Sequence, residues 1–220
     1  MFRKNAFHMN AAGRDLTLPF EPPKARAMFE QLDEIRADCA SRLIRAARDR
    51  KSPMHTPVIV TADVDARVMV LRAFDAANWT LRLHTDTRAP KARAIAADPR
   101  VAALFYDKGA KIQIRLRGEA RIESRGPVAD AAWAASTNFA RRCYLGEGPG
   151  APSDAATSGL PPEFEGVEPD AVQLLPAREN FAVLLIAVTV IDWLYLAHTG
   201  HVRAQFTRTG DRWDGRWVAP

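Results

Sequence analysis

The pattern of apolar positions begins with one long amphipathic segment. Between Ala25 and Arg50, apolar residues recur at three- and four-residue steps, the spacing that places them on one face of a helix. This face consists of Met28, Leu32, Ile35, Cys39, Leu43 and Ala46. The pattern therefore predicts a helix whose apolar face packs in the protein core. Residues 1–24 include "PFEPPK" and are predicted to form an N-terminal arm without regular structure.

The spacing then changes from helical to strand-like. Five runs rich in apolar and β-branched residues are separated mostly by short turns such as "VDA", "DAAN" and "DKGA". These runs cover residues 56–63, 67–74, 79–86, 100–107 and 111–123. In the last run the period is two, so Ile112, Ile114 and Leu116 face one way while Gln113 and Arg115 face the other. The runs predict half-buried strands.

Helical and loop signals interrupt this β pattern. The segment "APKARAIAADP" predicts a short helix, with Pro90 suited to its first turn and Pro99 ending it. A second helix is predicted from about Pro127 to Cys143. Residues 145–170 are rich in Gly, Pro and small residues, which predicts a long loop that is either mobile or ordered by a partner.

The C-terminal part returns to strand-like runs. They are "FAVLLIAVTVIDWLYL", "HVRAQFTR" and "RWDGRWVAP", and the "DG" of the last run is a hairpin-turn signal. Many short antiparallel strands at regular spacing favour a small barrel or sandwich. We therefore expect a mainly β, α+β protein in which residues 25–220 form one antiparallel barrel domain flanked by helices.

Composition restricts the classes of protein. The longest apolar stretch, 181–191, is shorter than the ~20 residues of a transmembrane helix, and the first residues lack a secretory signal pattern. Cys39 and Cys143 are far apart, and no Cys and His spacing is typical of a zinc site, so we expect free thiols in a reducing cytoplasm and no metal. The formal net charge of +5 is compatible with nucleic acid, but the arginines are scattered, which favours a solvated basic surface.

Two basic residues lie at positions where the pattern alone does not require them. Lys91 occupies the first turn of a predicted helix, where positive charge opposes the helix dipole at a cost of about 0.3–1 kcal/mol unless an anion compensates. Arg67 opens an apolar strand, where a guanidinium needs a carboxylate or phosphate. If both converge, they form a phosphate site at the rim of the barrel; the alternative is that each is simply solvated. Gln113 and Trp193 are candidates to contact a planar body attached to that phosphate.

The order of these elements resembles one known family. An R-x-x-x-L-[KR] strand at Arg67, "HTD", a helix opening with Lys91, "DPRVAALFY" and a Q-x-R-x-x-G strand at Gln113 follow one another, and "DWL", "GHVRAQF" and a terminal "W-x-P"-like tail close the chain. This arrangement, from about Ala25 to Pro220, resembles the pyridoxamine 5′-phosphate oxidase-related FMN-binding split barrels, as a diverged branch. The resemblance implies FMN as cofactor and a homodimer with FMN at its interface.

The resemblance also implies roles for individual residues. FMN-binding roles fall on Arg67, Val68, Met69, Val70, His84, Thr85, Lys91, Gln113, Trp193 and Arg203. Arg67 and Lys91 are implied to contact the phosphate, the backbone of residues 68–70 the flavin ring, and Gln113 its polar edge. Substrate-binding roles fall on Arg72, His201 and Arg203.

Three departures from the family pattern concern the substrate and the phosphate. Ala89 and Pro90 precede Lys91 where the family has Ser and Arg, so that Arg88 or Arg93 would have to replace one phosphate contact. Arg72 stands where the family has a lysine. The Tyr, Arg and Ser set that holds pyridoxamine phosphate has no counterpart in "WAASTNFARRCYLGEG".

We therefore expect an FMN-dependent oxidoreductase that acts on an unassigned small molecule without a nucleophilic side chain. One alternative is a split barrel that binds flavin, haem or deazaflavin without oxidase activity. The other is a protein that binds nucleic acid through its basic surface, without sequence specificity.

Overall fold

The computed structural model describes residues 30–220. The predicted arm, 1–24, and the start of the predicted N-terminal helix lie outside the described residues. The helix itself, α1, runs from Leu32 to Arg48.

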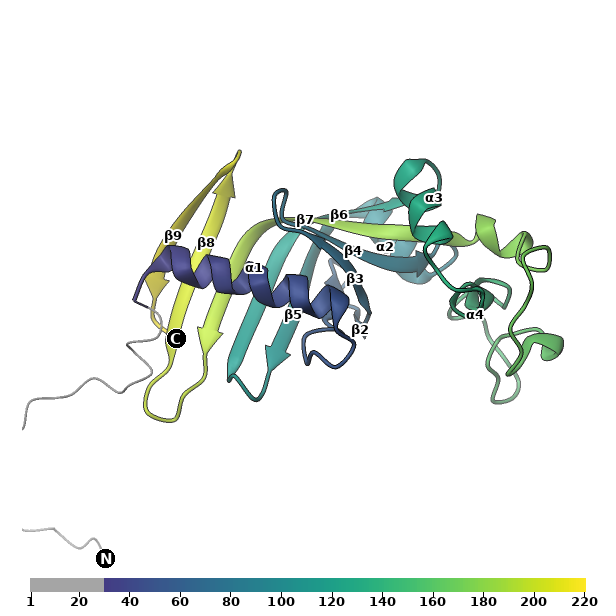
Figure 1. Cartoon of the computed structure of the whole chain (residues 1–220), viewed down its shortest axis with the longest axis horizontal. Coiled ribbons are helices and arrows are strands. Elements are labelled where there is room, and N and C mark those ends of the chain that lie inside the picture. Colours follow the sequence, from purple (N-terminus) through teal and green to yellow (C-terminus); the bar gives the residue numbers. More distant parts are fainter. Residues whose placement is uncertain (1–29) are drawn as a thin grey trace, which may run out of the picture.

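The described residues form one antiparallel sheet of nine strands. The strands are β1 (Val58–Thr61), β2 (Ala66–Val68), β3 (Leu71–Asp75), β4 (Thr80–Asp86), β5 (Arg100–Asp107), β6 (Ile112–Glu123), β7 (Phe181–Tyr195), β8 (Val202–Thr209) and β9 (Arg212–Val218). Along the sheet the order is β2-β1-β5-β6-β7-β4-β3, and the hairpin β8–β9 pairs with β7. The strands at the two ends of this path, β2 and β3, are consecutive in the chain, so the sheet curls into a half-barrel (Figure 1).

Strand β7 divides the sheet into two parts. Its first half, Phe181 to Ala187, pairs with β4, and its second half, Val190 to Tyr195, pairs with β8. Strand β6 follows β7 along nearly its whole length, with a register shift between Arg117 and Gly118. The long apolar stretch noted in the sequence is therefore a buried strand shared by both parts. This arrangement confirms the predicted antiparallel split barrel with flanking helices.

The main core lies between the sheet and α1, which crosses in front of the strands in Figure 1. The predicted apolar face of the helix is confirmed where it is described, since Ile35, Cys39, Leu43 and Ala46 are fully buried. Burying a Leu or Ile side chain contributes about 1.5–3 kcal/mol. The helix is thereby fixed against β3 and β9.

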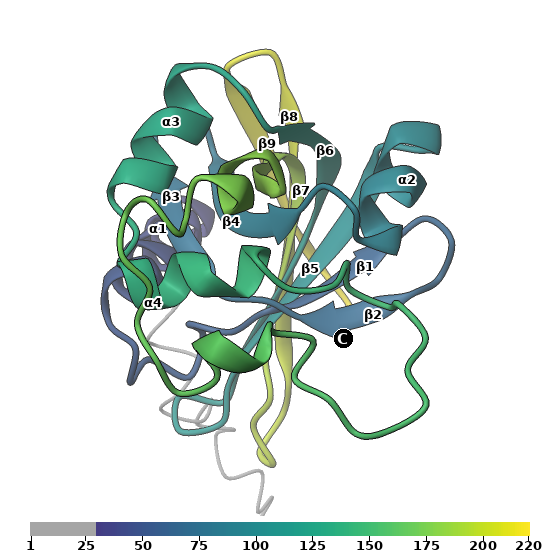
Figure 2. The ribbon, with the colours of Figure 1, turned by 90° about the vertical axis from the view of Figure 1, so that its right-hand side faces the viewer.

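The opposite side of β4 and β7 carries a second, smaller core. It joins Ala129 and Ala132 of α3 (Pro127–Ala134) to Phe181, Val183 and Leu185 of β7. Figure 2 looks onto this end of the molecule and shows α3 on one side and α2 (Pro90–Ala97) on the other.

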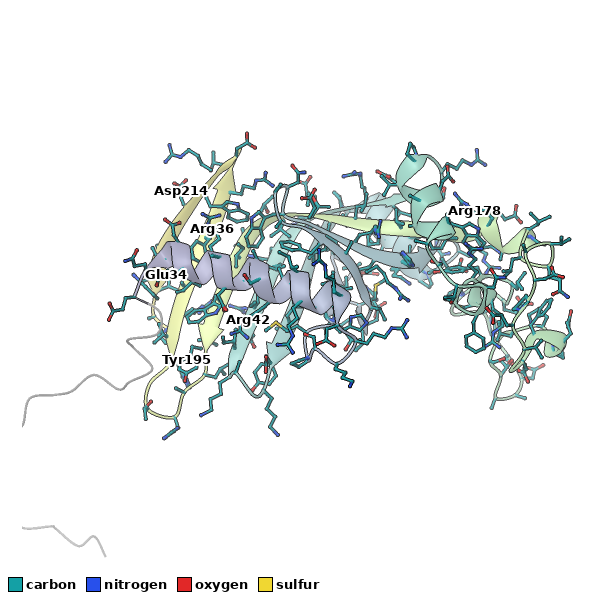
Figure 3. The ribbon with its side chains drawn as sticks, viewed as in Figure 1. Glu34, Arg36, Arg42, Arg178, Tyr195 and Asp214 are labelled. Carbon is teal, nitrogen blue, oxygen red and sulfur yellow. The ribbon has the colours of Figure 1, made fainter. Side chains whose placement is uncertain are left out.

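Arg178 fixes α3 in place. Its side chain is labelled at this end of the molecule in Figure 3; it donates to the Ser124 carbonyl at 2.9 Å and forms an ion pair with Asp130 of α3.

Three expectations for single elements are wrong. The predicted strand 67–74 is divided into β2 and β3, with Met69 and Val70 in neither strand. The predicted helix 127–143 is interrupted: α3 ends at Ala134 and a short helix, α4, runs from Asn138 to Arg141, followed by a 3₁₀ turn. The reason is Thr137, whose hydroxyl accepts from the Ala140 amide at 3.2 Å as the N-cap of a new helix. The "DG" at Asp214 and Gly215 lies inside β9, and the β8–β9 turn forms instead at Gly210, where φ is 61°.

The loop 145–170 is attached to its own chain. The Arg88 guanidinium donates to the Gly146 carbonyl at 3.0 Å, and Arg142 donates to the Phe164 carbonyl at 2.8 Å. Within the loop, the Glu147 amide bonds the Gly159 carbonyl at 2.8 Å.

No helix within residues 30–220 is both long and apolar enough to cross a membrane.

Candidate functional site

Arg67 and Lys91 lie near each other at one end of the half-barrel. Arg67 lies on β2 opposite Ile59 of β1, and its guanidinium donates to Thr61 Oγ1 at 3.0 Å and forms an ion pair with Asp65. Lys91 lies in the first turn of α2. The pKa of Lys91 is lowered, first by burial and then by the positive charge of Arg67, although nearby carboxylates oppose this. The positive charges of Arg67 and Lys91 repel each other, and an anion bound between them would relieve this repulsion.

The start of α2 adds to this basic site. Its N-cap residue, Ala89, provides no side-chain hydrogen bond, and the first turn contains no acidic residue. Pro90 has no N–H and the Ala92 amide donates to the Ala89 carbonyl at 2.8 Å, so the first turn offers an anion the positive end of the helix dipole beside Lys91.

The two arginines suggested as substitutes for the missing phosphate contact are placed differently. The Arg88 guanidinium binds both carboxylate oxygens of the buried Asp86, at 3.0 and 2.7 Å, and also the Gly146 carbonyl. Arg88 therefore fixes the loop rather than lying free beside Lys91. Arg93 is exposed on α2.

The backbone between Arg67 and Arg72 follows an open edge. Within the described residues, β2 pairs only with β1, so its other edge has no strand partner. Val68 is 66% exposed, and the Met69 amide bonds the Pro57 carbonyl at 3.0 Å. The implied flavin-contacting residues 68–70 are thus accessible along their outer edge.

Arg72 and His84 line a cavity of about 280 Å³. Arg72 is the bulged residue between Leu71 and Ala73 of β3, and His84 lies on β4 opposite Val183 of β7. The other lining residues come from the segment after α3 and from the loop: Ser136, Phe139, Ala140, Arg142, Cys143, Tyr144 and Leu160. Asp86 acts electrostatically on both Lys91 and Tyr144, which places the cavity next to the basic site.

His84 is neutral at physiological pH. Burial, followed by the charges of Arg72 and Arg82, lowers its pKa to about 4. Its Nε2 is buried and has no hydrogen-bond partner within residues 30–220. The neighbouring Thr85, by contrast, is buried, and its hydroxyl donates to the Asp86 carbonyl at 3.4 Å.

Gln113 and Arg203 lie on the same face of the sheet, the outer face, which is the one turned away from the main core. They flank Leu194 of β7 in adjacent ladders, since Leu194 pairs with Gln113 on one side and Arg203 on the other. Arg203 and Arg115 both bind Asp192, each at 2.6 Å, and Gln205 donates to the same carboxylate at 2.9 Å.

The charge of Asp192 depends on these partners. Burial acts to raise its pKa, but the bonds from Arg203, Gln205 and Arg115 outweigh it, so the pKa is lowered. Sequence reasoning missed this cluster, although a single acid in the apolar run "VTVIDWL" is a signal for it.

The remaining predicted residues lie elsewhere. Trp193 alternates with Asp192 along β7 and is fully buried in the main core beside Ile114 and Ala204, rather than on the outer face. His201 is exposed in the connection between β7 and β8. In Figure 3, Tyr195 marks that end of β7 and Arg178 the opposite end, where the cavity lies.

Within one chain, the residues of the predicted site therefore lie in three separate places. Arg67 and Lys91 lie together at the end of the half-barrel, with Arg72 and His84 in the adjacent cavity. Gln113 and Arg203 lie on the outer face. The register places Arg67 in one row with the buried Ile59, whereas Gln113 alternates with the buried Ile112 and Ile114 and projects from the other face. Within one chain, Arg67 and Gln113 therefore lie on opposite faces of the sheet.

The sequence was compared with protein-family models, and residues 41–124 match the one described as "Pyridoxamine 5'-phosphate oxidase, FMN-binding domain". No curated protein matches the chain.

Among solved structures, a pyridoxamine 5′-phosphate oxidase-related, FMN binding protein from Nostoc punctiforme PCC 73102 is 22% identical, with a TM-score of 0.65, over 83% of this chain and 96% of that one. PhzG from Burkholderia lata 383, solved with tetrahydrophenazine-1-carboxylic acid, is 15% identical with a TM-score of 0.55, over 94% and 98% of the two chains. At these identities the structures establish the shared fold.

Proposed function

We propose that this chain, a member of the pyridoxamine 5′-phosphate oxidase-related split-barrel family by its matched segment and its fold, binds FMN and acts as an FMN-dependent oxidoreductase. One observation carries the proposal: two cations, Arg67 and Lys91, lie together at an uncapped helix start, beside a strand edge with no partner. This combination fits a phosphate joined to a flat polar body.

The residues present fit FMN in chemical type. Arg67 and Lys91 would hold its phosphate, and the open backbone of residues 68–70 would hydrogen-bond the flavin. Gln113 and Arg203 would come from a second copy of the chain, because their face of the sheet points away from Arg67. FMN, when bound, supplies hydride or electron transfer, whereas the protein supplies binding and orientation.

The chain's own residues would bind and orient the substrate. Arg72 would attract an anionic substrate group, and the neutral His84 ring would form part of the cavity wall. His201 and Arg203 would reach the same substrate only from the partner copy, since they lie near the far end of β7.

An absorbance spectrum of the purified protein, before and after addition of FMN and gel filtration, tests cofactor binding. We expect the visible flavin bands to remain with the protein. A protein that elutes colourless after incubation with FMN contradicts the proposal.

Oxidoreductase activity needs a separate test. Candidate amines and alcohols are added anaerobically to the FMN-loaded protein, and we expect at least one to bleach the flavin, with recovery in air. No bleaching by any candidate, while dithionite still reduces the bound flavin, would contradict an oxidase and leave a flavin-binding protein.

One observation favours the alternative of a cofactor-binding protein without oxidase activity. Arg141 and Arg142 lie in the segment where the family holds its substrate, but their guanidinium groups donate to backbone carbonyls of Trp133 and Phe164. They are structural in this chain. Haem in place of flavin would give an intense band at the violet edge of the spectrum, which distinguishes a haem-binding split barrel.

A further inference from the structure

We infer that the cavity of about 280 Å³ between β3, β4 and the segment after α3 binds a single-ring molecule that carries one carboxylate. That this molecule is the substrate rests on the proposed FMN function. The class of ligand rests on the cavity itself.

The first step is the charge of the cavity. No Asp or Glu lines it, whereas Arg72 and Arg142 both do. The Arg142 guanidinium is occupied: it donates to the Phe164 and Val167 carbonyls at 2.8 and 3.2 Å and lies 4.1 Å from the centre of the Phe139 ring. Arg72 has no ion pair within residues 30–220, although its charge lowers the pKa of His84. One free guanidinium matches one planar carboxylate, bound by two parallel hydrogen bonds.

The second step is the shape and polarity of the walls. Phe139, Tyr144, His84 and Leu160 present flat or apolar groups to the cavity. Burial raises the pKa of Tyr144, so its phenol is neutral. Small-molecule pockets span about 300–1,000 Å³, and this cavity is at the lower limit. Such a space holds one ring with a short substituent.

The third step is the side chain of His84, which lines the cavity. His84 Nε2 is inaccessible to solvent and unbonded, while the ring itself packs edge-on against Phe181, with 5.0 Å between centroids. Buried polar groups in native proteins are nearly always hydrogen-bonded. Because solvent does not reach Nε2, a ligand in the cavity contacts the rest of the His84 ring, which offers it a flat and uncharged wall.

The fourth step is the rigidity of the far wall. The Asn180 side-chain amide donates to the Tyr144 carbonyl at 2.9 Å, and Arg142 fixes the segment around Phe164. Tyr144 also packs edge-on against Phe181, with 5.1 Å between centroids. The cavity is therefore formed by groups that are already fixed, as is usual for ligand pockets.

Calorimetric titration of the full chain tests the inference, with benzoate, benzamide and phenyl phosphate as probes. We expect benzoate to bind at least tenfold more tightly than benzamide, which has the same shape without the charge. Arg72→Gln should weaken benzoate binding at least tenfold. The control Arg125→Gln, at an exposed arginine outside the cavity, should leave it unchanged.

Three results would overturn the inference. They are equal binding of benzoate and benzamide, unchanged benzoate binding by Arg72→Gln, and tighter binding of phenyl phosphate than of benzoate. Each titration is done with and without FMN, whose binding is measured separately by its absorbance. Benzoate binding that depends on Arg72 in a protein that ignores FMN would support the ligand class and refute the proposed cofactor function.

Discussion

The protonation of His84 gives a prediction at the scale of a residue. Because burial and the charges of Arg72 and Arg82 lower its pKa to about 4, the folded protein resists a proton that the unfolded chain accepts near pH 6.5. The contribution of neutral His84 to the free energy of unfolding is therefore fully present above pH 6.5, and it is lost as the pH falls from 6.5 to 4. Allowing for partial exposure of the ring, we expect His84 to account for up to about 2 kcal/mol of this loss.

Urea unfolding of the wild type and of His84→Gln, at pH 7 and pH 4.5, measures this effect. Other groups titrate in the same range, so the relevant quantity is the difference between the two proteins. The variant should lose less stability on acidification than the wild type. Equal losses would show that His84 is protonated as easily in the folded state as in the unfolded chain.

At the residue scale, the useful sequence signal was a charge that conflicts with its local structure. Lys91 opposes the dipole of its own helix, and the structure places it near Arg67, while phosphate binding by the two residues stays a prediction. The cavity residues Phe139, Tyr144 and Leu160 gave no such signal. They come from two segments whose approach depends on tertiary contacts made by Arg142 and Asn180.

At the scale of an element, Gly118 explains how β6 and β7 stay paired along their whole length. It is the glycine of the Q-x-R-x-x-G pattern and lies at the register shift between the two strands. A Cβ added there would lie 1.9 Å from the Ala187 carbonyl oxygen. This oxygen belongs to the backbone, so it cannot move away by a side-chain rotation. Only glycine fits this close approach.

Gly118→Ala should therefore destabilise the fold by about 3 kcal/mol or more, since the strands must separate or the bulge must shift. The free energy of unfolding in urea measures it. Gly109→Ala is the matched control, because its added Cβ would meet only the Asp107 carboxylate at an ordinary 3.4 Å. A cost for Gly118→Ala no larger than that of the control would contradict the role assigned to the glycine.

The elements themselves were mostly predictable, because hydrophobic period and turn residues are local signals. The eight predicted strand runs account for the nine strands, because the run 67–74 forms both β2 and β3, and α2 begins at Pro90 as expected. The failures occurred where two local signals competed. Thr137 caps a new helix within an otherwise helical pattern, and Asp214-Gly215 lies in a strand because the hairpin closes at Gly210.

At the scale of the whole molecule, the division of the site predicts a shared active site in a homodimer. Arg67 and Gln113 lie on opposite faces of the sheet, so one FMN can contact both only if two copies meet. Arg67→Ala and Gln113→Ala should each weaken FMN binding. Mixing the two variants and allowing subunits to exchange should restore one intact site per mixed dimer, which contains Arg67 from one copy and Gln113 from the other.

Restoration is measured by FMN bound per chain, with each variant alone as the control. Analytical ultracentrifugation gives the oligomeric state of the same samples. A monomer that binds FMN tightly, or no recovery after complete subunit exchange, would contradict the shared site.

The central claim is that Arg67 and Lys91 bind the phosphate of FMN, and one titration tests this claim most directly. The dissociation constant of FMN is measured by quenching of flavin fluorescence for the wild type, Arg67→Ala, Lys91→Ala and Arg93→Ala. Since a hydrogen bond to a charged group contributes about 1.5–3 kcal/mol, we expect the first two variants to bind about 10–100-fold more weakly. The control variant Arg93→Ala, changed at an exposed residue of the same helix as Lys91, should bind FMN as tightly as the wild type. Wild-type affinity in both Arg67→Ala and Lys91→Ala would contradict the account.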